Sequence, residues 1–162
     1  MISTNSLAIN SKIFLKSNLF NLKPKFAISN EKNWQLEIPK IDLVAKISEG
    51  VEKENLDCYV GHFEETHLVF GNVVLAAHNR GYKVNYFSRI KELEEGDLII
   101  YRCGKIENKY EVVEERIIFD TNVNILQETK DNRITLITCV ENIPNQRRVI
   151  IGFLKNRKEI YE

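Results

Sequence analysis

The chain has 162 residues, of which 43% are hydrophobic and 28% are charged, and its formal net charge at pH 7 is zero. This length suits one domain with a short appendage and is enough to bury a substantial core. The balanced charge argues against nucleic acid or an anionic membrane as a partner, since both select a basic surface patch.

Cysteine usage and hydropathy exclude several further classes. The three cysteines, Cys58, Cys103 and Cys139, are too few and too scattered for a disulfide framework. No clustered Cys or His spacing indicates a structural zinc site, so no metal ligands are expected. The longest apolar runs fall well below the roughly 18 residues that a membrane helix needs, so the chain as given is expected to be soluble.

The first 33 residues differ from the rest of the chain. Apolar groups alternate there with Asn, Ser and Lys, and Pro24 interrupts the weak helical spacing. The segment lacks the charged start, apolar centre and cleavage site of a signal peptide. Residues 1–33 are therefore expected to be a tail or an appended helix, without a membrane anchor, and residues 34–162 to form the folded domain.

From Trp34 onward the sequence is dominated by β signals. Alternating or β-branched apolar segments are separated by Gly, Pro, Asn and Asp. Residues 51–59 and 86–93 have helical composition, and the segment 61–67 reads as a polar loop. Eight short strands with two or three small helices predict a mostly β fold, a closed or nearly closed barrel. The expected strands include residues 34–41, 43–47, 72–78, 98–103, 109–119, 134–139 and 149–154.

The last two of these strands predict an antiparallel hairpin. If residues 140–146 form a symmetric loop, Cys139 faces Arg147 and Ile137 faces Val149 on the same side of the sheet. A slip of one residue would bring in Arg148 instead. A thiol beside a fixed cation indicates nucleophilic chemistry, because the cation favours the thiolate. The alternative is a small buried hydrophobe next to a surface arginine.

Few other side chains have a pattern that points to chemistry. His78 ends an apolar strand and precedes a loop, a position suited to a reactive group, although a hydrogen-bonded rim residue is equally consistent. His62 and His67 are expected to be solvated, and Cys58 and Cys103 to be structural. A calcium site across two loops is conceivable, but no loop carries a dense set of ligands.

The residues around Cys139 resemble a known family. Thr135 to Cys139 reads Thr-Leu-Ile-Thr-Cys, Arg147 follows on the next strand, and residues 75–78 read Leu-Ala-Ala-His. This ordered set is similar to that of the bacterial sortases, which are cysteine transpeptidases, and the resemblance extends over roughly residues 34–156. Ala77 stands where the family usually has Gly. The resemblance implies a closed eight-stranded sortase-type barrel.

The resemblance also implies a mechanism. Cys139 would attack the threonine carbonyl of a Leu-Pro-x-Thr-Gly-like sorting signal, His78 would act as acid and base, and Arg147 would stabilise the oxyanion. The thioacyl enzyme would pass to an amine on the cell wall or on another protein, at the extracellular face of the cell membrane, with no cofactor. The residues implied in substrate binding are Ala76, Leu126, Ile137 and Thr138.

Two departures bear on the class of sortase. The loop from Asp120 to Arg133 is too short for the long helix of class B, and residues 1–33 lack the Asp-Pro-aromatic lid of class C. A class D-like or housekeeping-like enzyme is therefore favoured over classes B and C. Two other readings stay open: a cysteine hydrolase with the same three residues, and a non-catalytic β-barrel interaction module in which Cys139 is part of the core.

Overall fold

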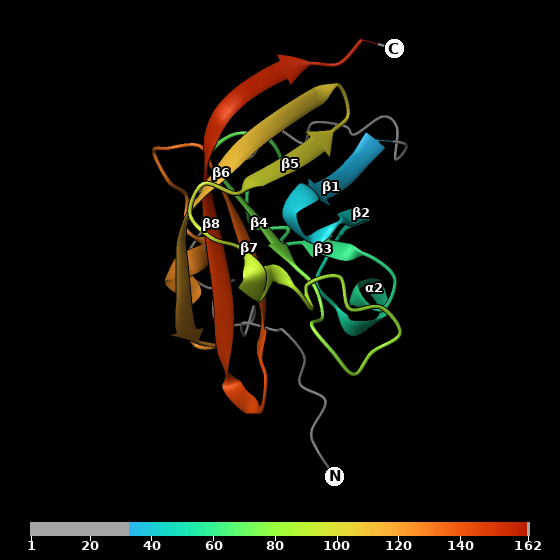
Figure 1. Cartoon of the computed structure of the whole chain (residues 1–162), viewed down its shortest axis with the longest axis vertical. Helices are drawn as coiled ribbons and strands as arrows, with labels where there is room; N and C mark the ends of the chain where they lie inside the picture. Colours follow the sequence, from blue (N-terminus) through green and yellow to red (C-terminus); the bar gives the residue numbers. More distant parts are fainter. Residues whose placement is uncertain (1–32, 162) are drawn as a thin grey trace.

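The computed structural model describes residues 33–161, and this part of the chain closes into an eight-stranded β-barrel (Figure 1). The order of strands around the barrel is β1-β2-β3-β4-β7-β8-β6-β5, with β5 pairing back onto β1. The predicted mostly β, closed eight-stranded fold is confirmed. The expectation for residues 1–33 lies, apart from Asn33, outside the described residues.

The strands keep the expected order, with some changed boundaries. The segment expected to be a polar loop after residue 60 begins with a strand, and the last strand is far longer than the pattern suggested. The bounds are β1 Trp34–Ile38, β2 Leu43–Glu49, β3 Val60–His62, β4 Asn72–Ala76, β5 Leu98–Cys103, β6 Ile106–Phe119, β7 Arg133–Val140 and β8 Ile143–Glu159.

The helices of the described chain are single turns. One is an α-helix and three are 3-10 helices, where two or three short helices were expected. Pro39 begins the first of them directly after β1, since its fixed φ suits the first helical position and it cannot donate to a strand ladder. None of these helices is long and apolar enough to cross a membrane. Their bounds are η2 Pro39–Ile41, α2 Lys53–Leu56, η3 Ile90–Glu92 and η4 Val123–Leu126.

Two pairings decide where the reactive residues lie. β4 runs parallel to β7, with Ala76 beside Ile137, and β7 runs antiparallel to β8. Parallel neighbours end at the same edge of a sheet. The loops that follow β4 and β7 therefore start side by side, and the beginning of β8 returns to the same edge.

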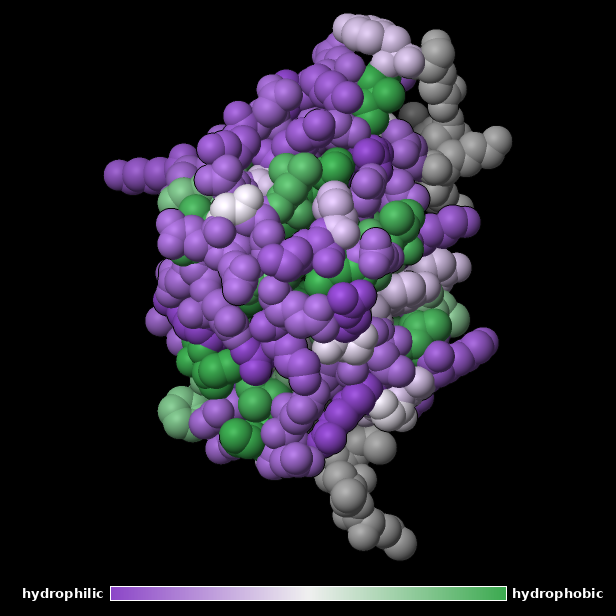
Figure 2. Space-filling model, in the orientation of Figure 1, coloured by the Kyte–Doolittle hydropathy of each residue, from purple (hydrophilic) through white to green (hydrophobic). Residues whose placement is uncertain are grey.

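The sheet formed by β4, β7 and β8 buries apolar side chains on both faces. One face contributes Leu75, Leu136 and Ile150 to the interior of the barrel. The opposite face carries a second cluster, in which Val74 and Ile137 pack against the 3-10 helix η4. Figure 2 shows that hydrophilic residues cover most of the molecular face seen in Figure 1, with small separate hydrophobic patches. The second cluster is covered by the β6–β7 loop, because η4 lies in that loop.

Candidate active site

The β7–β8 hairpin has the expected register at its centre. Cys139 pairs with Arg147 and Ile137 with Val149, as the symmetric loop predicted. The loop itself is different, because Val140 pairs with Ile143 and the register shifts between Cys139 and Val140. Asn142 has φ 63°, a left-handed conformation that Asn tolerates in a two-residue turn. The extra residues 144–146 bulge from β8, and they return Arg147 to its place opposite Cys139.

His78 lies next to Cys139 at the shared edge of β4 and β7. The Ala77 amide donates to the Ile137 carbonyl at 3.4 Å, which continues the parallel register by one step. The Asn79 side chain donates to the Cys139 carbonyl at 2.7 Å. One more step of the same register leads to His78, just past the end of β4, and to Cys139 on β7. The two residues thus lie at the same sheet edge through the pairing of strands that are distant in the sequence.

The imidazole of His78 is 2% exposed and is held by Tyr82, from its own loop, and by Asp57, which follows α2. Its ring stacks on Tyr82 with a centroid separation of 3.6 Å and an interplanar angle of 6°. Its Nε2 lies 3.4 Å from Oδ1 of Asp57. Burial lowers the pKa of His78, and the Asp57 carboxylate acts in the opposite direction.

Burial dominates the ionisation of Cys139. The thiol is only partly exposed, and burial raises its pKa, while the charges of Arg147 and Arg80 lower it and that of Asp120 raises it. The cation expected from the sequence therefore acts in the expected direction, but desolvation outweighs it. In the resting structure both Cys139 and His78 favour their neutral forms near pH 7.

Arg147 is buried and only partly satisfied. It is 1% exposed, and its Nη1 donates to the carbonyls of Pro144 (2.9 Å) and Gln146 (2.8 Å). Its Nη2 lies 3.7 Å from the Asp120 carboxylate, and its Nε is buried without a hydrogen bond. An unused donor on a buried guanidinium is costly unless a ligand accepts from it. Arg148 points to the other face of the hairpin and pairs with Glu115.

Three of the four residues expected to bind substrate share one face. Ala76, Leu126 and Ile137 belong to the second apolar cluster, each 5% exposed or less. Strand alternation places the side chain of Cys139 on the same face as that of Ile137, two residues before it. Thr138 points to the opposite face, where its hydroxyl donates to the Ala77 carbonyl at 2.7 Å.

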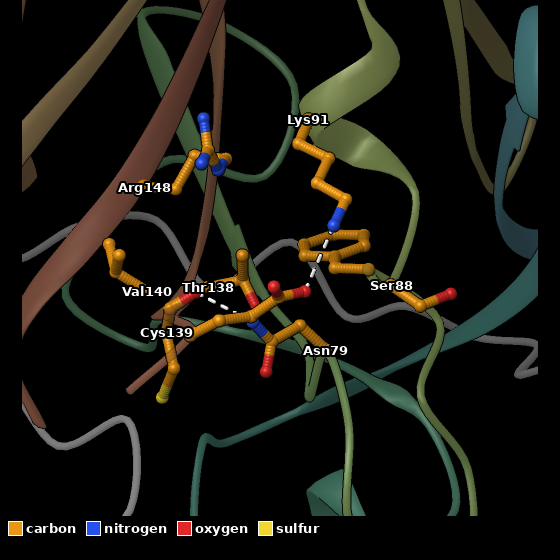
Figure 3. A pocket seen from close by; sticks show the side chains of 9 residues that line it. Asn79, Ser88, Lys91, Thr138, Cys139, Val140 and Arg148 are labelled. Atoms are coloured by element: carbon orange, nitrogen blue, oxygen red, sulfur yellow. Dashed lines mark hydrogen bonds and ion pairs between the residues drawn. The ribbon is translucent and has the colours of Figure 1, made fainter. Parts of the chain in front are cut away.

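A cavity of about 200 Å³ lies on the Thr138 side of the hairpin (Figure 3). Lys91 and Glu141 form an ion pair of 3.0 Å across its rim. Cys139 is among the residues that line this cavity, and in Figure 3 its sulfur points away from Lys91 and Arg148. The second apolar cluster, with Ile137, lies on the opposite face of the hairpin.

Other candidate residues have mixed outcomes. Cys103 is buried, as expected of a structural residue, whereas Cys58 is exposed. His62 is also not solvated: it is 1% exposed and lies in β3. His67 remains partly exposed, with Nε2 3.1 Å from a carboxylate oxygen of Glu128. Residues 33–161 hold no group of three or more His, Cys, Asp or Glu side chains placed to bind a metal ion.

No sequence pattern pointed to two residues that contact His78. Asp57 stands in a segment expected only to be helical, and Tyr82 stands in a loop with no assigned role. Both reach His78 through the packing of α2 and the loop after β4 against one end of the barrel (Figure 1). No local pattern marks such contacts, because they join residues that are separated in the chain and carry no periodic signal.

Comparison with known proteins agrees with this geometry. A sortase domain family model matches residues 36–154. A Sortase D of Bacillus subtilis is 35% identical over 126 residues, which cover 72% of this chain and 61% of the relative. A Sortase A of Listeria monocytogenes is 30% identical over 129 residues, which cover 77% and 57%. The chain therefore spans about three-fifths of the length of these curated relatives.

Solved structures support the same assignment. The crystal structure of a Listeria monocytogenes sortase A superposes with a TM-score of 0.74 and 27% identity, covering 80% of this chain and 90% of that one. A pilus-related sortase C of Group B Streptococcus gives a TM-score of 0.73 and 26% identity, with coverage of 78% and 69%. The similarity to a Sortase D agrees with the class D-like interpretation. The residues matched by the family model, 36–154, include parts of all eight strands together with His78 and Cys139, and the chain belongs to the sortase family.

Proposed function

We propose that residues 34–162 form the catalytic domain of a sortase-type cysteine transpeptidase, with Cys139 as nucleophile, His78 as acid and base, and Arg147 as oxyanion donor. The observation that carries the proposal is the arrangement of these three residues. Cys139 pairs with Arg147 across the hairpin, and His78 lies at the same sheet edge on the neighbouring strand. The family membership of the chain supports the reaction type.

The first half of the reaction forms a thioester. The Cys139 thiolate attacks the threonine carbonyl of a Leu-Pro-x-Thr-Gly-like signal, and the tetrahedral oxyanion accepts hydrogen bonds from Arg147. The peptide C–N bond then breaks as the His78 imidazolium gives its proton to the departing amine. The buried Nε of Arg147, which has no partner at rest, is a donor available to the substrate.

The second half transfers the acyl group. An incoming amine attacks the thioester, neutral His78 takes its proton, and Cys139 leaves as thiolate. The thiolate and imidazolium are thereby regenerated together. Burial disfavours the charge on both residues, so this ion pair is a minority form near pH 7. We expect the reaction rate to be limited by the fraction of molecules that carry this ion pair. We also expect the bound substrate to exclude water from the site and to supply hydrogen bonds in place of that water.

We further propose a binding surface and a setting for the reaction. The apolar cluster formed by Ala76 and Ile137 of the sheet and Leu126 of the β6–β7 loop would receive the apolar residues of the sorting signal, between the sheet and that loop. Thr138 contributes by fixing the end of β4 through its bond to Ala77. The signal belongs to surface proteins, the acceptor is an amine on the cell wall or on another protein, and the domain works at the extracellular face of the membrane.

The deciding experiment is mass spectrometry of the intact protein incubated with Leu-Pro-x-Thr-Gly-type peptides, with and without an added amine. We expect an acyl adduct on Cys139 that clears to an amide product when the amine is present. Clearance only to the free acid would instead identify a cysteine hydrolase. The Cys139→Ala variant is the matched control, because it keeps the fold and removes the sulfur.

A non-catalytic barrel would also show a raised thiol pKa, so the pKa of Cys139 does not separate the two readings. The adduct does separate them. A core cysteine in an interaction module would form no thioester with any peptide in a panel of sorting-signal variants, and that result would refute the proposal.

A further inference from the structure

The imidazole of His78 lies between two segments that are far apart in the sequence, the loop after β4 and the end of α2. Tyr82 covers one face of the ring, and Asp57 approaches its edge at Nε2. Both Nε2 and Asp57 Oδ1 are buried without a hydrogen bond, and the two atoms lie 3.4 Å apart. No hydrogen bond to the other ring nitrogen, Nδ1, is found within residues 33–161.

Hydrogen bonds within the loop hold Tyr82 in place. The Phe87 amide donates to the His78 carbonyl at 3.0 Å, which closes residues 78–87 into a loop. Inside the loop, Asn85 accepts from the Tyr82 amide at 3.3 Å and donates to the Tyr82 carbonyl at 2.9 Å. The Tyr82 ring is thus set over His78 by backbone bonds on both sides of it, and the stack fixes the plane of the imidazole.

The Asp57 side is equally supported. Asp57 follows α2, and its Oδ2 accepts from Lys53 Nζ at 2.6 Å. The Tyr86 hydroxyl donates to the Cys58 carbonyl at 3.2 Å, which ties the end of α2 to the loop that carries Tyr82. One carboxylate oxygen is therefore occupied by Lys53, while the other is left for His78.

We propose that Asp57 and Tyr82 are positioning residues for His78: they hold Nε2–H toward the Asp57 carboxylate and leave Nδ1 to exchange the proton with the substrate amine. This inference rests on the proposed transpeptidase function. A carboxylate at the far nitrogen of a catalytic imidazole fixes its tautomer and stabilises the imidazolium. Tyr82 acts through ring orientation alone, since an acid or base that is misplaced by about 1 Å can lose roughly 100-fold in rate.

The charges around His78 allow a test in which two substitutions should shift its pKa in opposite directions. Asp57 raises the pKa of His78, whereas Lys53, on the same helix, lowers it. Tyr82, from its own loop, stacks on His78, and Cys139 and Arg147 pair with each other on the hairpin at the same sheet edge. Removing the carboxylate and removing the ammonium should therefore move the titration of His78 in opposite directions. A merely structural role for α2 predicts no such pattern.

The experiment is an NMR titration of the three histidines in the full chain, with the His78 signals assigned by their loss in His78→Gln. We expect Asp57→Asn to lower the His78 midpoint and Lys53→Gln to raise it. Glu54→Gln removes an exposed carboxylate on the same helix and should leave the midpoint in place. Unchanged midpoints in both variants, or shifts of the same sign, would overturn the role of Asp57. Lys53 is exposed, so its variant keeps the test valid even if Asp57→Asn folds poorly.

Turnover completes the test for Tyr82. We expect Tyr82→Leu to lower kcat about 10- to 100-fold with little change in KM, and Tyr82→Phe, which keeps the aromatic ring, to restore it. In Asp57→Asn the acidic limb of the kcat/KM profile, which follows the titration of His78, should move to lower pH with the His78 midpoint. Equal loss in Tyr82→Leu and Tyr82→Phe would overturn the stacking role. The titration requires no turnover, so absence of an adduct with every peptide would reject the transpeptidase while the titration still reports on Asp57.

Discussion

Two histidines, His62 on β3 and His78 beyond β4, are buried to nearly the same extent but differ in the hydrogen bonding of their ring nitrogens. They are 1% and 2% exposed. His62 uses both ring nitrogens: Nδ1 lies 2.6 Å from Glu49 Oε1, and Nε2 lies 3.0 Å from the His67 carbonyl and 3.1 Å from the Thr66 hydroxyl. His78 has a buried Nε2 without a hydrogen bond and a stacked neighbour.

Burial alone therefore does not identify a reactive histidine. Buried polar groups in folded proteins are nearly always hydrogen-bonded, so an unpaired one requires an explanation. The His62 region is satisfied and holds β2, β3 and the following loop together. The region around His78, Cys139 and Arg147 collects unpaired or weakly paired groups at one sheet edge, as expected of a site that is completed by a substrate.

The largest effect should come from the nucleophile. Cys139→Ala removes the sulfur that forms the thioester, so turnover of a sorting-signal peptide with an amine should be lost, as measured by product formation. Cys103→Ala and Cys58→Ala are the matched controls and should keep most of the activity, since neither thiol lies at the shared edge. If Cys139→Ala retained turnover, the reaction would take place at another site, and the distinction between the His62 region and the His78 region would fail.

The two histidines can be compared directly by the same substitution. His78→Gln should lower kcat/KM by about 10²- to 10⁴-fold, the usual contribution of a general acid and base, with little change in the free energy of unfolding. His62→Gln should do the reverse. It should cost about 1 to 3 kcal/mol, because buried partners lose their hydrogen bonds, and should keep the activity per folded molecule.

Peptide turnover and urea unfolding, both measured on the two variants, check these expectations. If His62→Gln lost activity at full stability, the distinction between a satisfied and a reactive histidine would fail.

The hairpin register predicts a smaller contrast between neighbouring arginines. Arg147→Ala should lower the rate of thioester formation by about 10²- to 10³-fold, the usual effect of losing one oxyanion donor. Arg148→Ala should change it little, because Arg148 faces the cavity and pairs with Glu115. Single-turnover kinetics measure this step without the later transfer. The reverse order would show that Arg148 rather than Arg147 reaches the substrate.

The smallest expected effect is on thiol ionisation. The charge of Arg147 lowers the pKa of Cys139 and opposes the larger effect of burial. Alkylation of Cys139 by iodoacetamide should therefore rise with pH at higher values than for an exposed thiol, and Arg147→Ala should move this rise to still higher pH. Cys58, which is exposed, serves as the internal reference and should react with unchanged pH dependence. A downward shift in Arg147→Ala would contradict the charge assignment.

The sequence predicted much of the fold and part of the site. Alternation of apolar residues along the last two strands predicted that Ile137 and Cys139 share a face, and counting across the loop predicted Arg147 as the partner of Cys139. The shape of the loop was not predictable in this way. A two-residue turn with a left-handed Asn142, followed by a bulge, gives the same central register as a symmetric loop of seven residues.

The periodic features of this protein could be predicted from the residue pattern: which segments are strands, which faces are apolar, and which reactive residues end a strand. These features depend on neighbours along the chain. The parallel pairing of β4 with β7, the contacts of Asp57 and Tyr82 with His78, and the burial of His62 became apparent in the folded barrel. Contacts between distant segments and the desolvation that raises the pKa of Cys139 exist only once the barrel has closed, because closure sets both the neighbours and the access of water.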